Sequence, residues 1–400
     1  MKLSTVFVCV GLIFKCIVIY YFYIALRYGL KKPKSFSRAM PVTSFAILIA
    51  ARNEEAVIGR LVESLLKQEY PRALFCTYVI PNNCTDQTAA AAYAAGAEIL
   101  TCNYPVRYKG DALHQAVCQL KERKYDAYVI FDADNVVDKH FLSRINDAFC
   151  AGAKIVKGRH VAMNPKASWV AGCYDIYFSG FDLLFNRPRA NGKLSAKLVG
   201  TGFSVKREVL EDLGGWNTST IAEDAEFAAQ CAGAGYPVAW APDAVTYDEE
   251  PIAFLQSVQQ RKRWSSGVMQ VSRKMLPILL NGKGGRLCFD MIAFLLMPFA
   301  QSLSVLSMLG ATAARLAEQG AAAMAPMVLT VFLSYCSGMF AAAFMIMVER
   351  EQPQRNRVSI LLFPLFMATW FPLQILALFH RTTFWKEMYH GTRARSVQLL

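Results

Sequence analysis

Acidic side chains stand at two places where their spacing could support catalysis on a phosphorylated substrate. Asp132 and Asp134 lie one residue apart directly after an apolar run, so both carboxylates can face one divalent ion that neutralises a diphosphate. Glu223 and Asp224 precede a helical pattern, and one of these carboxylates could act as general base for an attacking hydroxyl group. Structural interpretations compete with both: Asp134 or Asn135 could begin the following helix, and acidic residues are favoured in a helix's first turn.

Basic and small residues at two other positions are suited to binding an anion. Lys109 begins the helical pattern KGDALHQAV, where the helix dipole disfavours a cation unless an anion shares the site. A solvated lysine is the alternative interpretation. Gly200 and Gly202 flank Thr201 ahead of an expected strand, where they could allow a ligand close to the main chain or simply form a turn.

The segment QQRKRWSSG, residues 259–267, combines three cations with a tryptophan. In a helix, Gln260, Arg263 and Trp264 would share one face, and we predict that they belong to an active site. Arg261 and Lys262 would point elsewhere, and we predict that they lie at a membrane surface, near anionic lipid. An apolar stripe just upstream favours an amphipathic interfacial helix and comprises Ile252, Leu255 and Val258.

Apolar runs of strand length alternate with helical patterns between residues 44 and 131. This alternation predicts a mostly parallel sheet covered by helices on both faces. In such sheets ligands bind where loops leave the carboxyl ends of the strands, which is where ARNEE, PNNCTD and DADN occur. The chain has neither GxGxxG after the first strand nor GxxxxGK[ST], which disfavours a dinucleotide dehydrogenase and a P-loop nucleotidase. The expected strands are 44–51, 75–80, 97–101 and 127–131, and the expected helices are 54–68, 85–96 and 109–123.

The first apolar run, residues 4–26, is long enough to cross a hydrocarbon core of about 30 Å. Basic residues follow it instead of a small-residue cleavage site, which indicates an uncleaved anchor with the N-terminus outside and the globular domain in the cytoplasm. Lys15 lies within this run, and we expect it either to snorkel or to face another helix.

Three further apolar runs, at about 288–312, 327–348 and 358–379, follow the globular part. Residues 349–357 and the C-terminal tail are both basic and favour the cytoplasm, although one crossing appears between them in the sequence. We therefore expect one of the three runs to be re-entrant or interfacial. The predicted organisation is an anchor at 1–30, a globular domain at 40–250, interface helices at 251–286, and a membrane region with tail at 287–400.

Composition narrows the partners of this 400-residue chain, which is 54% apolar with a net charge of +13. The charge fits an anionic membrane leaflet and an anionic nucleotide. We expect no nucleic acid, because the cations lie at membrane borders and in no groove-reading motif. The 11 cysteines are scattered without zinc-ligand spacing, which favours a reduced, cytosolic chain.

Seven motifs, in order between residues 43 and 267 and flanked by membrane segments, resemble those of the membrane-bound family 2 glycosyltransferases. These motifs are ARNEE, NNCTD, KGDAL, DADN, GTGF, AED and QQRKRW. The family includes the cellulose, chitin and hyaluronan synthases and smaller bacterial relatives. The resemblance implies a GT-A fold, which is Rossmann-like, a UDP-sugar donor, a Mn²⁺ or Mg²⁺ ion, and inversion at the anomeric carbon.

The resemblance also implies a role for each matching residue. Asp134 would be the principal metal ligand, with Asp132 near the ribose and the metal. Asp224 would be the general base. The family usually has an aspartate beside the uracil where this chain has Asn82, although an amide also hydrogen-bonds a pyrimidine edge. Arg263 would neutralise the departing UDP, and Trp264 would form a platform under the acceptor sugar. Lys109 would lie by the nucleotide and Glu54 near the uridine. Gln260 would belong to the active site.

The function expected from this resemblance is hexosyl transfer at the cytoplasmic face of a multi-pass plasma-membrane protein. The Gln-x-x-Arg-Trp pattern favours a processive synthase that extends the non-reducing end of a polysaccharide. Single transfer to a lipid acceptor is the alternative, so the acceptor is expected to be an oligosaccharide or a lipid-linked group, and a homo-oligomer is left open. A non-catalytic scaffold subunit would not need the carboxylates that are present, and a transporter lacks support from an intramembrane acidic pair.

Overall fold

An eight-stranded mixed sheet forms the centre of the computed structural model, which describes residues 3–29, 31–33, 35–349 and 357–379. The strand order is β3-β2-β1-β4-β7-β6-β8-β5. The first four strands of this order are parallel, whereas β7 runs antiparallel to both its neighbours and β5 runs antiparallel to β8. The strands are β1 (Phe45–Ala51), β2 (Phe75–Pro81), β3 (Glu98–Ile99), β4 (Ala127–Phe131), β5 (Val136–Val137), β6 (Ile155–Ala162), β7 (Phe203–Lys206) and β8 (Val238–Asp248).

Helices cover both faces of the sheet, because successive strand side chains point to opposite sides and build two cores. In β1, Phe45 and Ile47 belong to different cores from Ala46 and Leu48. Helices over the first core are α2 (Ile58–Leu66), α3 (Thr88–Ala94) and α5 (Phe141–Cys150). Helices over the second core are α4 (Lys109–Gln119), α8 (Arg207–Asp212), α9 (Glu223–Ala234) and α10 (Phe254–Leu280). Short 3₁₀ turns are η1 (Arg72–Leu74) and η2 (Lys121–Arg123).

The four predicted strands are confirmed, and the mixed sheet with its helical layers has the predicted GT-A architecture. Two predicted helices begin later than expected, at Ile58 instead of 54 and at Thr88 instead of 85. The polar residues ahead of them form tight turns at the strand ends, in which Asn53 and Asn83 adopt positive φ angles of 56° and 50°. Asparagine tolerates that conformation better than most residues, so the motif residues turn the chain at the sheet edge.

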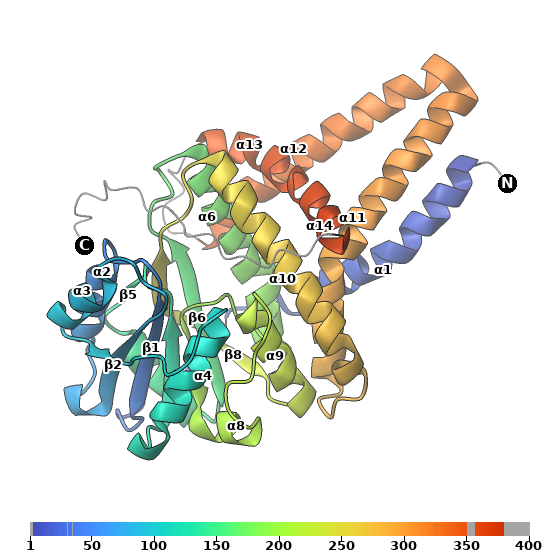
Figure 1. Cartoon of the computed structure of the whole chain (residues 1–400). Coiled ribbons are helices and arrows are strands. Elements are labelled where there is room, and N and C mark those ends of the chain that lie inside the picture. Colours follow the sequence, from blue (N-terminus) through green and yellow to red (C-terminus); the bar gives the residue numbers. More distant parts are fainter. Residues whose placement is uncertain (1–2, 30, 34, 350–356, 380–400) are drawn as a thin grey trace.

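Three helical stretches are long and apolar enough to cross a membrane: Leu3–Gly29, Arg286–Val348 and Arg357–Phe379. The second stretch is a hairpin of α11 (Arg286–Gln319), η4 (Gly320–Ala323) and α12 (Met324–Glu349), which extends away from the sheet (Figure 1). The third stretch consists of α13 (Arg357–Ala368) and α14 (Trp370–Phe379). The basic tail beyond residue 379 and most of the basic segment 349–357 lie outside the described residues.

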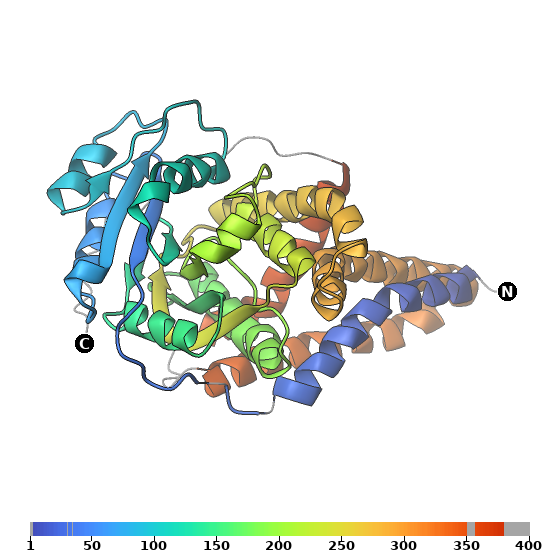
Figure 2. The ribbon, with the colours of Figure 1, turned by 90° about the horizontal axis from the view of Figure 1, so that it is seen from below.

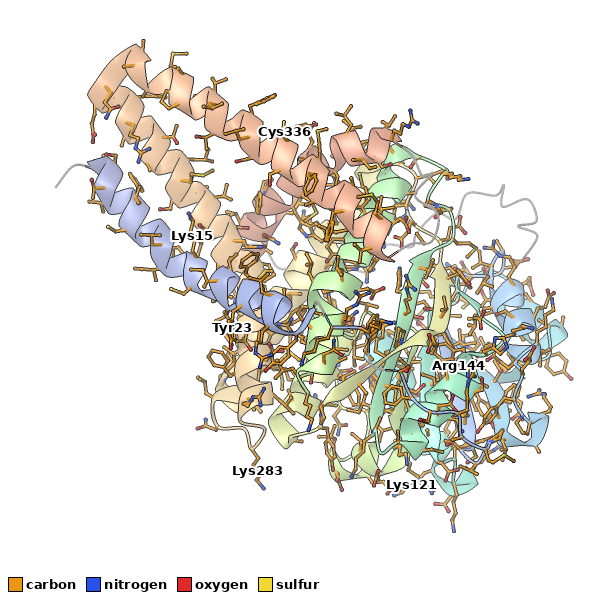
Figure 3. The ribbon with its side chains drawn as sticks, turned by 180° about the vertical axis from the view of Figure 1, so that it is seen from behind. Lys15, Tyr23, Lys121, Arg144, Lys283 and Cys336 are labelled. Carbon is orange, nitrogen blue, oxygen red and sulfur yellow. The ribbon has the colours of Figure 1, made fainter. Side chains whose placement is uncertain are left out.

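Helix α1 (Leu3–Gly29) lies along α11 in both ribbon views (Figures 1 and 2). Small residues allow the two helices to approach closely. A Cβ added at Gly11 would lie 3.1 Å from the Ser307 hydroxyl, and one at Gly310 would lie 2.8 Å from the Phe7 ring. Lys15, halfway along α1, is exposed and so is not buried against another helix (Figure 3).

Helix α10 lies between the sheet domain and the apolar helices, in contact with α9, α11 and α14 (Figure 1). A second connection runs through α6 (Trp169–Phe181), η3 (Asp182–Asn186) and α7 (Arg187–Asn191). Arg189 in α7 is fully buried and forms two hydrogen bonds of 2.9 Å with Asp290 in α11. The Asp290 carboxylate also accepts a hydrogen bond from Tyr20 in α1, so one buried cluster ties both apolar helices to the sheet domain.

Candidate active site

A cavity of about 570 Å³ lies between the carboxyl ends of β1 and β4, helix α10 and the apolar helices. Its volume is within the range of small-molecule sites, roughly 300–1,000 Å³. Among the described residues, the lining includes eight of the nine site residues predicted from the sequence: Glu54, Lys109, Asp132, Asp134, Asp224, Gln260, Arg263 and Trp264. The fold therefore brings together side chains from five motifs that are far apart in the sequence.

Lys109 holds the polar end of the cavity together. Its Nζ donates to Asp132 Oδ1 at 2.5 Å and to the Gly200 carbonyl at 2.6 Å, and lies 3.5 Å from Glu223 Oε1. Burial alone would lower the pKa of Lys109, but Asp132 and Glu223 outweigh it and hold the pKa above the ordinary value, so the side chain is charged. The alternative interpretation of Lys109 as a solvated lysine is wrong, because the side chain is buried between two acids.

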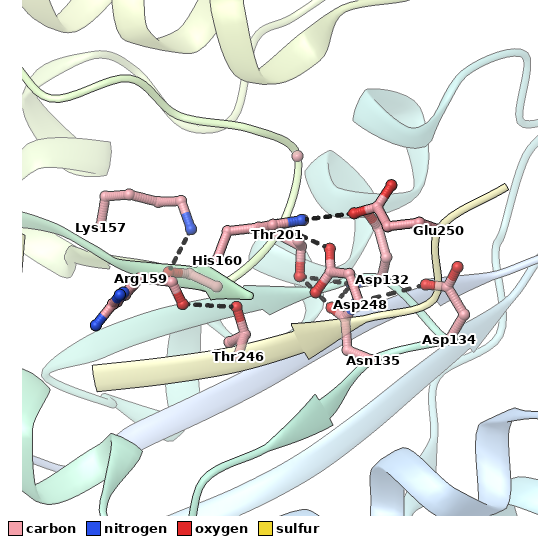
Figure 4. Close-up of polar contacts among 12 residues, drawn as sticks. Asp132, Asp134, Asn135, Lys157, Arg159, His160, Thr201, Thr246, Asp248 and Glu250 are labelled. Carbon is pink, nitrogen blue, oxygen red and sulfur yellow. Dashed lines mark hydrogen bonds and ion pairs between the residues drawn. The ribbon is translucent and has the colours of Figure 1, made fainter. Parts of the chain in front are cut away.

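The turn after β4 presents Asp132 and Asp134 to the cavity (Figure 4). The Asp132 main-chain N–H donates to Asn135 Oδ1 and to Thr201 Oγ1, each at 3.1 Å. Thr201 and Asn135 are also hydrogen-bonded to each other. This threonine, between the two glycines of GTGF, therefore fixes the acidic turn, while Gly200 and Gly202 have positive φ angles of 76° and 61°.

The two aspartates of this turn fit a divalent metal ion. Carboxylate oxygens are the donors that Mn²⁺ and Mg²⁺ prefer, and the Asp132 side chain is 41% exposed to the cavity. No three His, Cys, Asp or Glu side chains in the described part of the chain are grouped closely enough to hold a metal alone. Asp132 and Asp134 thus suit an ion that completes its coordination with a bound diphosphate and water, and such an ion would offset the diphosphate's charge.

Glu223 and Asp224 begin α9 at the centre of the cavity wall. Burial raises the pKa of Glu223 to about 7, although the Lys109 ammonium opposes this effect. Burial also raises the pKa of Asp224, against the Ala225 N–H and the charge of Lys197. A carboxylate with a raised pKa is a stronger base, so this pair has the property that a general base requires.

Helix α10 contributes Gln260, Arg263 and Trp264 to the cavity, as the helical spacing predicted. Lys262 is exposed, and its predicted position at a membrane surface stays a prediction. The prediction for Arg261 is wrong, because this side chain is fully buried. Its guanidinium donates to the Phe366 carbonyl at 3.0 Å and to Thr369 Oγ1 at 2.8 Å, where α13 gives way to α14.

Asn82 is the predicted site residue that the structure does not bring to the cavity. Its side chain is only 4% exposed, and its Nδ2 donates to the Ala51 carbonyl at 3.0 Å and the Ile80 carbonyl at 3.3 Å. The amide therefore links the ends of β1 and β2. Arg52, two residues before Glu54 in ARNEE, lines the cavity instead and was not singled out from the sequence.

The opposite end of the cavity is apolar and is formed by side chains of α6, η3 and α10 together with the candidate membrane helices. Trp264 meets Trp370 of α14 with ring centroids 6.2 Å apart, and Tyr177 of α6 lies 4.8 Å from the same Trp370 ring. Sequence reasoning missed Trp370 and Tyr177, since neither belongs to a polar motif. The apolar lining also includes Phe181, Phe185, Phe294, Met297, Phe299, Met345, Phe363, Met367 and Phe371.

Two further ionisable residues in the lining were also missed. His160 in β6 has both ring nitrogens 3.0 Å from a carboxylate, Nε2 from Glu250 and Nδ1 from Asp248 (Figure 4). These carboxylates overcome the effect of burial and raise the pKa of His160 to about 9. Lys197, three residues before Gly200, reaches the cavity from the other side. Its proximity to GTGF is the one signal that could have indicated it.

With this geometry established, comparison with known proteins decides the family. The family model described as "Glycosyltransferase like family 2" matches residues 41–267, which is more than half of the chain. The chain belongs to this family. The family 2 match begins just before β1 and ends within α10, so it spans the sheet and every predicted site residue.

Individual relatives of this family 2 chain come from several organisms. Probable glycosyltransferase YdaM of Bacillus subtilis is 26% identical over 299 residues, covering 70% of each chain. Beta-monoglucosyldiacylglycerol synthase of Nostoc is 28% identical over 278 residues, covering 66% of this chain but only 57% of the synthase. The solved mannosyltransferase PcManGT from Pyrobaculum calidifontis, in complex with GDP-Man and Mn²⁺, has a TM-score of 0.69 at 20% identity. That superposition covers 94% of this chain and 99% of PcManGT, which shows the shared fold.

Proposed function

We propose that this family 2 enzyme transfers one hexose from a nucleoside diphosphate sugar to a hydroxyl group of a membrane lipid. The observation that carries the proposal is the continuity of the cavity, which joins Asp132, Asp134 and Asp224 to an apolar chamber between candidate membrane helices. A lipid tail matches methionine and phenylalanine side chains, whereas a hydrated polysaccharide needs polar partners along its path. Similarity to a glucosyldiacylglycerol synthase supports the same choice. The processive synthase favoured by the Gln-x-x-Arg-Trp pattern becomes the alternative.

The proposed roles follow from where each side chain lies. Asp224 takes the proton of the acceptor hydroxyl as that oxygen attacks the anomeric carbon. Arg263, which faces the cavity from α10, offsets the charge that develops on the departing diphosphate. Lys109 fixes Asp132 for the donor and its metal ion, and Trp264 forms the wall against which the acceptor packs. One displacement of this kind inverts the anomeric carbon.

The donor is proposed to be a UDP-sugar, as the ordered motifs imply, with Mn²⁺ or Mg²⁺ beside Asp132 and Asp134. Because Asn82 does not line the cavity, the pyrimidine contact predicted for it is not part of the proposal. PcManGT binds GDP-Man, so both nucleotide classes belong in the donor panel.

We also propose that the sheet domain lies at the cytoplasmic face and that α1, α11 and α12 cross the membrane. The N-terminal end of α1 and the α11–α12 turn lie at the same far end of the molecule, away from the sheet (Figure 1). Helices α13 and α14 have 12 and 10 residues, or about 18 and 15 Å at 1.5 Å per residue, and each is too short to cross a core of about 30 Å. They pack on α6 and α10 at the sheet side, which fits the re-entrant or interfacial segment expected from charge.

The test is product analysis from the purified full-length chain in lipid nanodiscs with Mn²⁺ and radiolabelled UDP- or GDP-sugars. We expect label in a chloroform-soluble product of one discrete mass. Label in a water-soluble polymer of increasing length would instead establish the processive alternative.

Asp224→Asn should lower the turnover number about 10²–10⁴-fold, the range for losing a general base, while the protein remains folded. The matched control is Asp243→Asn, which alters an exposed aspartate of β8. Because the pKa of Asp224 is raised, wild-type turnover should fall as acid protonates this carboxylate. Turnover of Asp224→Asn at the wild-type rate would refute the assignment.

A further inference from the structure

Lys197 is a cavity-lining cation without an acidic partner. Its Nζ lies 4.2 Å from the centroid of the Phe181 ring and 5.4 Å from that of Phe294. No carboxylate of the described residues lies within ion-pair distance of it, in contrast to Lys109, which contacts both Asp132 and Glu223. Aromatic faces attract a cation by only about 0.5–2 kcal/mol, so this ammonium retains capacity to bind an anion.

The main chain at Lys197 is held firmly. The Lys197 N–H donates to Asn186 Oδ1 at 3.0 Å, and Asn186 Nδ2 donates to Asp182 Oδ1 at the same distance. Asp182 and Asn186 begin and end η3, a π-helical turn between α6 and α7. π-Helical turns are rare in proteins, and those that do occur are frequently found at functional sites. The turn therefore places a defined lysine at the cavity wall.

The charge environment of Lys197 points to a ligand. Burial lowers the pKa of Lys197 to about 8, and Asp224 is the carboxylate whose charge opposes this effect. At Lys109, the carboxylates of Asp132 and Glu223 stabilise the charged ammonium. An anion bound at Lys197 Nζ would stabilise the Lys197 ammonium in the same way. Asp224 marks the position of the acceptor hydroxyl in the proposed function, so such an anion would lie beside the reacting group.

The position of Lys197 distinguishes between the anions that could bind. In the proposed function, the donor diphosphate would have Lys109, Arg263 and a metal ion held by Asp132 and Asp134 as its partners. Lys197 lies instead between Phe181 of α6 and Phe294 of α11, where the apolar chamber begins. An anion bound at that position would be attached to an apolar chain that occupies the chamber. The phosphate of a lipid headgroup is an anion of this kind.

We propose that Lys197 binds the phosphate of an anionic acceptor lipid whose headgroup also carries the hydroxyl that is glycosylated at Asp224. The proposal rests on the lipid-acceptor function and adds the chemical class of the lipid: a phospholipid with a free hydroxyl group in its headgroup. It distinguishes this chain from an enzyme that takes a neutral diacylglycerol.

A binding experiment tests the lysine without depending on catalysis. Wild type, Lys197→Met and Lys197→Arg are compared by native mass spectrometry for retention of phosphatidylglycerol and of diacylglycerol, with no donor present. We expect wild type and Lys197→Arg to retain phosphatidylglycerol, and Lys197→Met to retain about tenfold less while its diacylglycerol binding is unchanged. Lys193→Met, which alters an exposed lysine four residues away, is the matched control. Equal retention by wild type and Lys197→Met would overturn the proposal.

A transfer experiment separates this inference from the proposed function. Nanodiscs of phosphatidylcholine contain either phosphatidylglycerol or diacylglycerol as acceptor. Wild type should show at least tenfold higher kcat/KM on phosphatidylglycerol, and Lys197→Met should lose that preference with an unchanged donor KM. A higher donor KM with an unchanged acceptor preference would assign Lys197 to the donor and overturn the inference. Transfer to neither lipid, with polymer formed instead, would refute the proposed function, while the binding result still decides the lysine.

Discussion

Arg263 and Lys262 are adjacent in sequence and have different surroundings. Arg263 lines the cavity, whereas Lys262 is exposed. If Arg263 offsets charge on the departing diphosphate, Arg263→Ala should lower kcat about 10²–10³-fold, the usual effect of removing one such group. Lys262→Ala should retain most activity, because its charge faces solvent or lipid headgroups. Steady-state kinetics on membrane-bound, folded protein checks both variants. Similar, mild losses of kcat in the two variants would indicate that residues 259–267 only anchor the protein to the membrane.

His160 should make stability depend on pH. Its folded pKa of about 9 exceeds the ordinary value of 6.5, so its charged form stabilises the fold fully below about pH 6.5 and less as pH rises through 9. Asp248 and Glu250 face the ring, and Phe178 lies against it at 3.8 Å. We therefore expect the unfolding midpoint of wild type to exceed that of His160→Gln most at pH 6 and least above pH 9.

The measurement for His160 is a difference between two thermal unfolding curves at each pH in one detergent. The difference is needed because burial lowers the pKa of Lys157 and of Lys197 to about 8, so these lysines change stability in the opposite direction. A gap between wild type and His160→Gln that does not change from pH 6 to pH 9 would contradict a charged histidine.

At this scale, the sequence predicted the polar end of the site well and the apolar end poorly. Asp132, Asp224 and Arg263 were found because each belongs to a short polar motif whose residue types and spacing can be recognised in the sequence. Trp370 and Tyr177 resemble any other aromatic residues of an apolar helix, so only packing reveals that they line the cavity.

At the scale of secondary-structure elements, Arg261 connects α10 to the junction between α13 and α14. Its guanidinium bonds the Phe366 carbonyl and Thr369 hydroxyl and lies 4.2 Å from the centroid of the Phe366 ring. Arg261→Met removes two buried hydrogen bonds, although the Thr369 hydroxyl still donates to the Phe366 carbonyl, so we expect a loss of roughly 1–3 kcal/mol in stability. Because Trp370 follows the junction directly, the acceptor KM should also rise, with the donor KM unchanged.

Lys262→Met is the matched control for Arg261, since it introduces the same side chain at the neighbouring exposed position. Chemical denaturation and kinetics with each substrate varied in turn provide the two readouts. A stability and an acceptor KM equal to those of Lys262→Met would show that Arg261 does not hold the junction.

The break between α13 and α14 shows why element boundaries in this region could not be predicted. Pro364 and Pro372 are the local signals, yet Pro364 remains inside α13 and Pro372 lies in the first turn of α14, where proline costs little. Between them, Arg261, more than a hundred residues earlier, binds the Phe366 carbonyl and the Thr369 hydroxyl, so the junction also depends on a contact that is distant in sequence. The strands of the sheet were predictable because their apolar runs and polar ends are local.

The whole molecule places a polar reaction centre against an apolar chamber, and α10 is the element common to both. Its cavity face contributes Arg263, and Arg261 on the same helix binds the junction between α13 and α14. The buried pair of Arg189 and Asp290 fixes α11 to the sheet domain on the other side of the chamber. The chamber's two walls are therefore anchored to the same domain that carries the carboxylates, as an enzyme joining a soluble donor to a lipid acceptor requires.

The proposed membrane arrangement predicts which positions a membrane-impermeant maleimide reaches. The parent variant replaces the exposed cysteines Cys9, Cys16, Cys118 and Cys150 with alanine. It serves as the control for any labelling of the native cysteines that remain. New single cysteines are introduced at exposed positions by Ala322→Cys in the α11–α12 turn, Lys121→Cys in the sheet domain, Arg357→Cys at the start of α13 and Phe379→Cys at the end of α14.

In intact cells the reagent should label only Ala322→Cys, because the α11–α12 turn lies at the far end of the molecule from the sheet domain (Figure 1). Lys121→Cys should require permeabilised cells. The two ends of the α13–α14 segment decide between the arrangements left open by the basic segments: if it is re-entrant, Arg357→Cys and Phe379→Cys share the side of Lys121→Cys. Labelling of Phe379→Cys from outside would mean that α13 and α14 together cross the membrane, and the apolar chamber would then be enclosed by four spans instead of opening toward one leaflet.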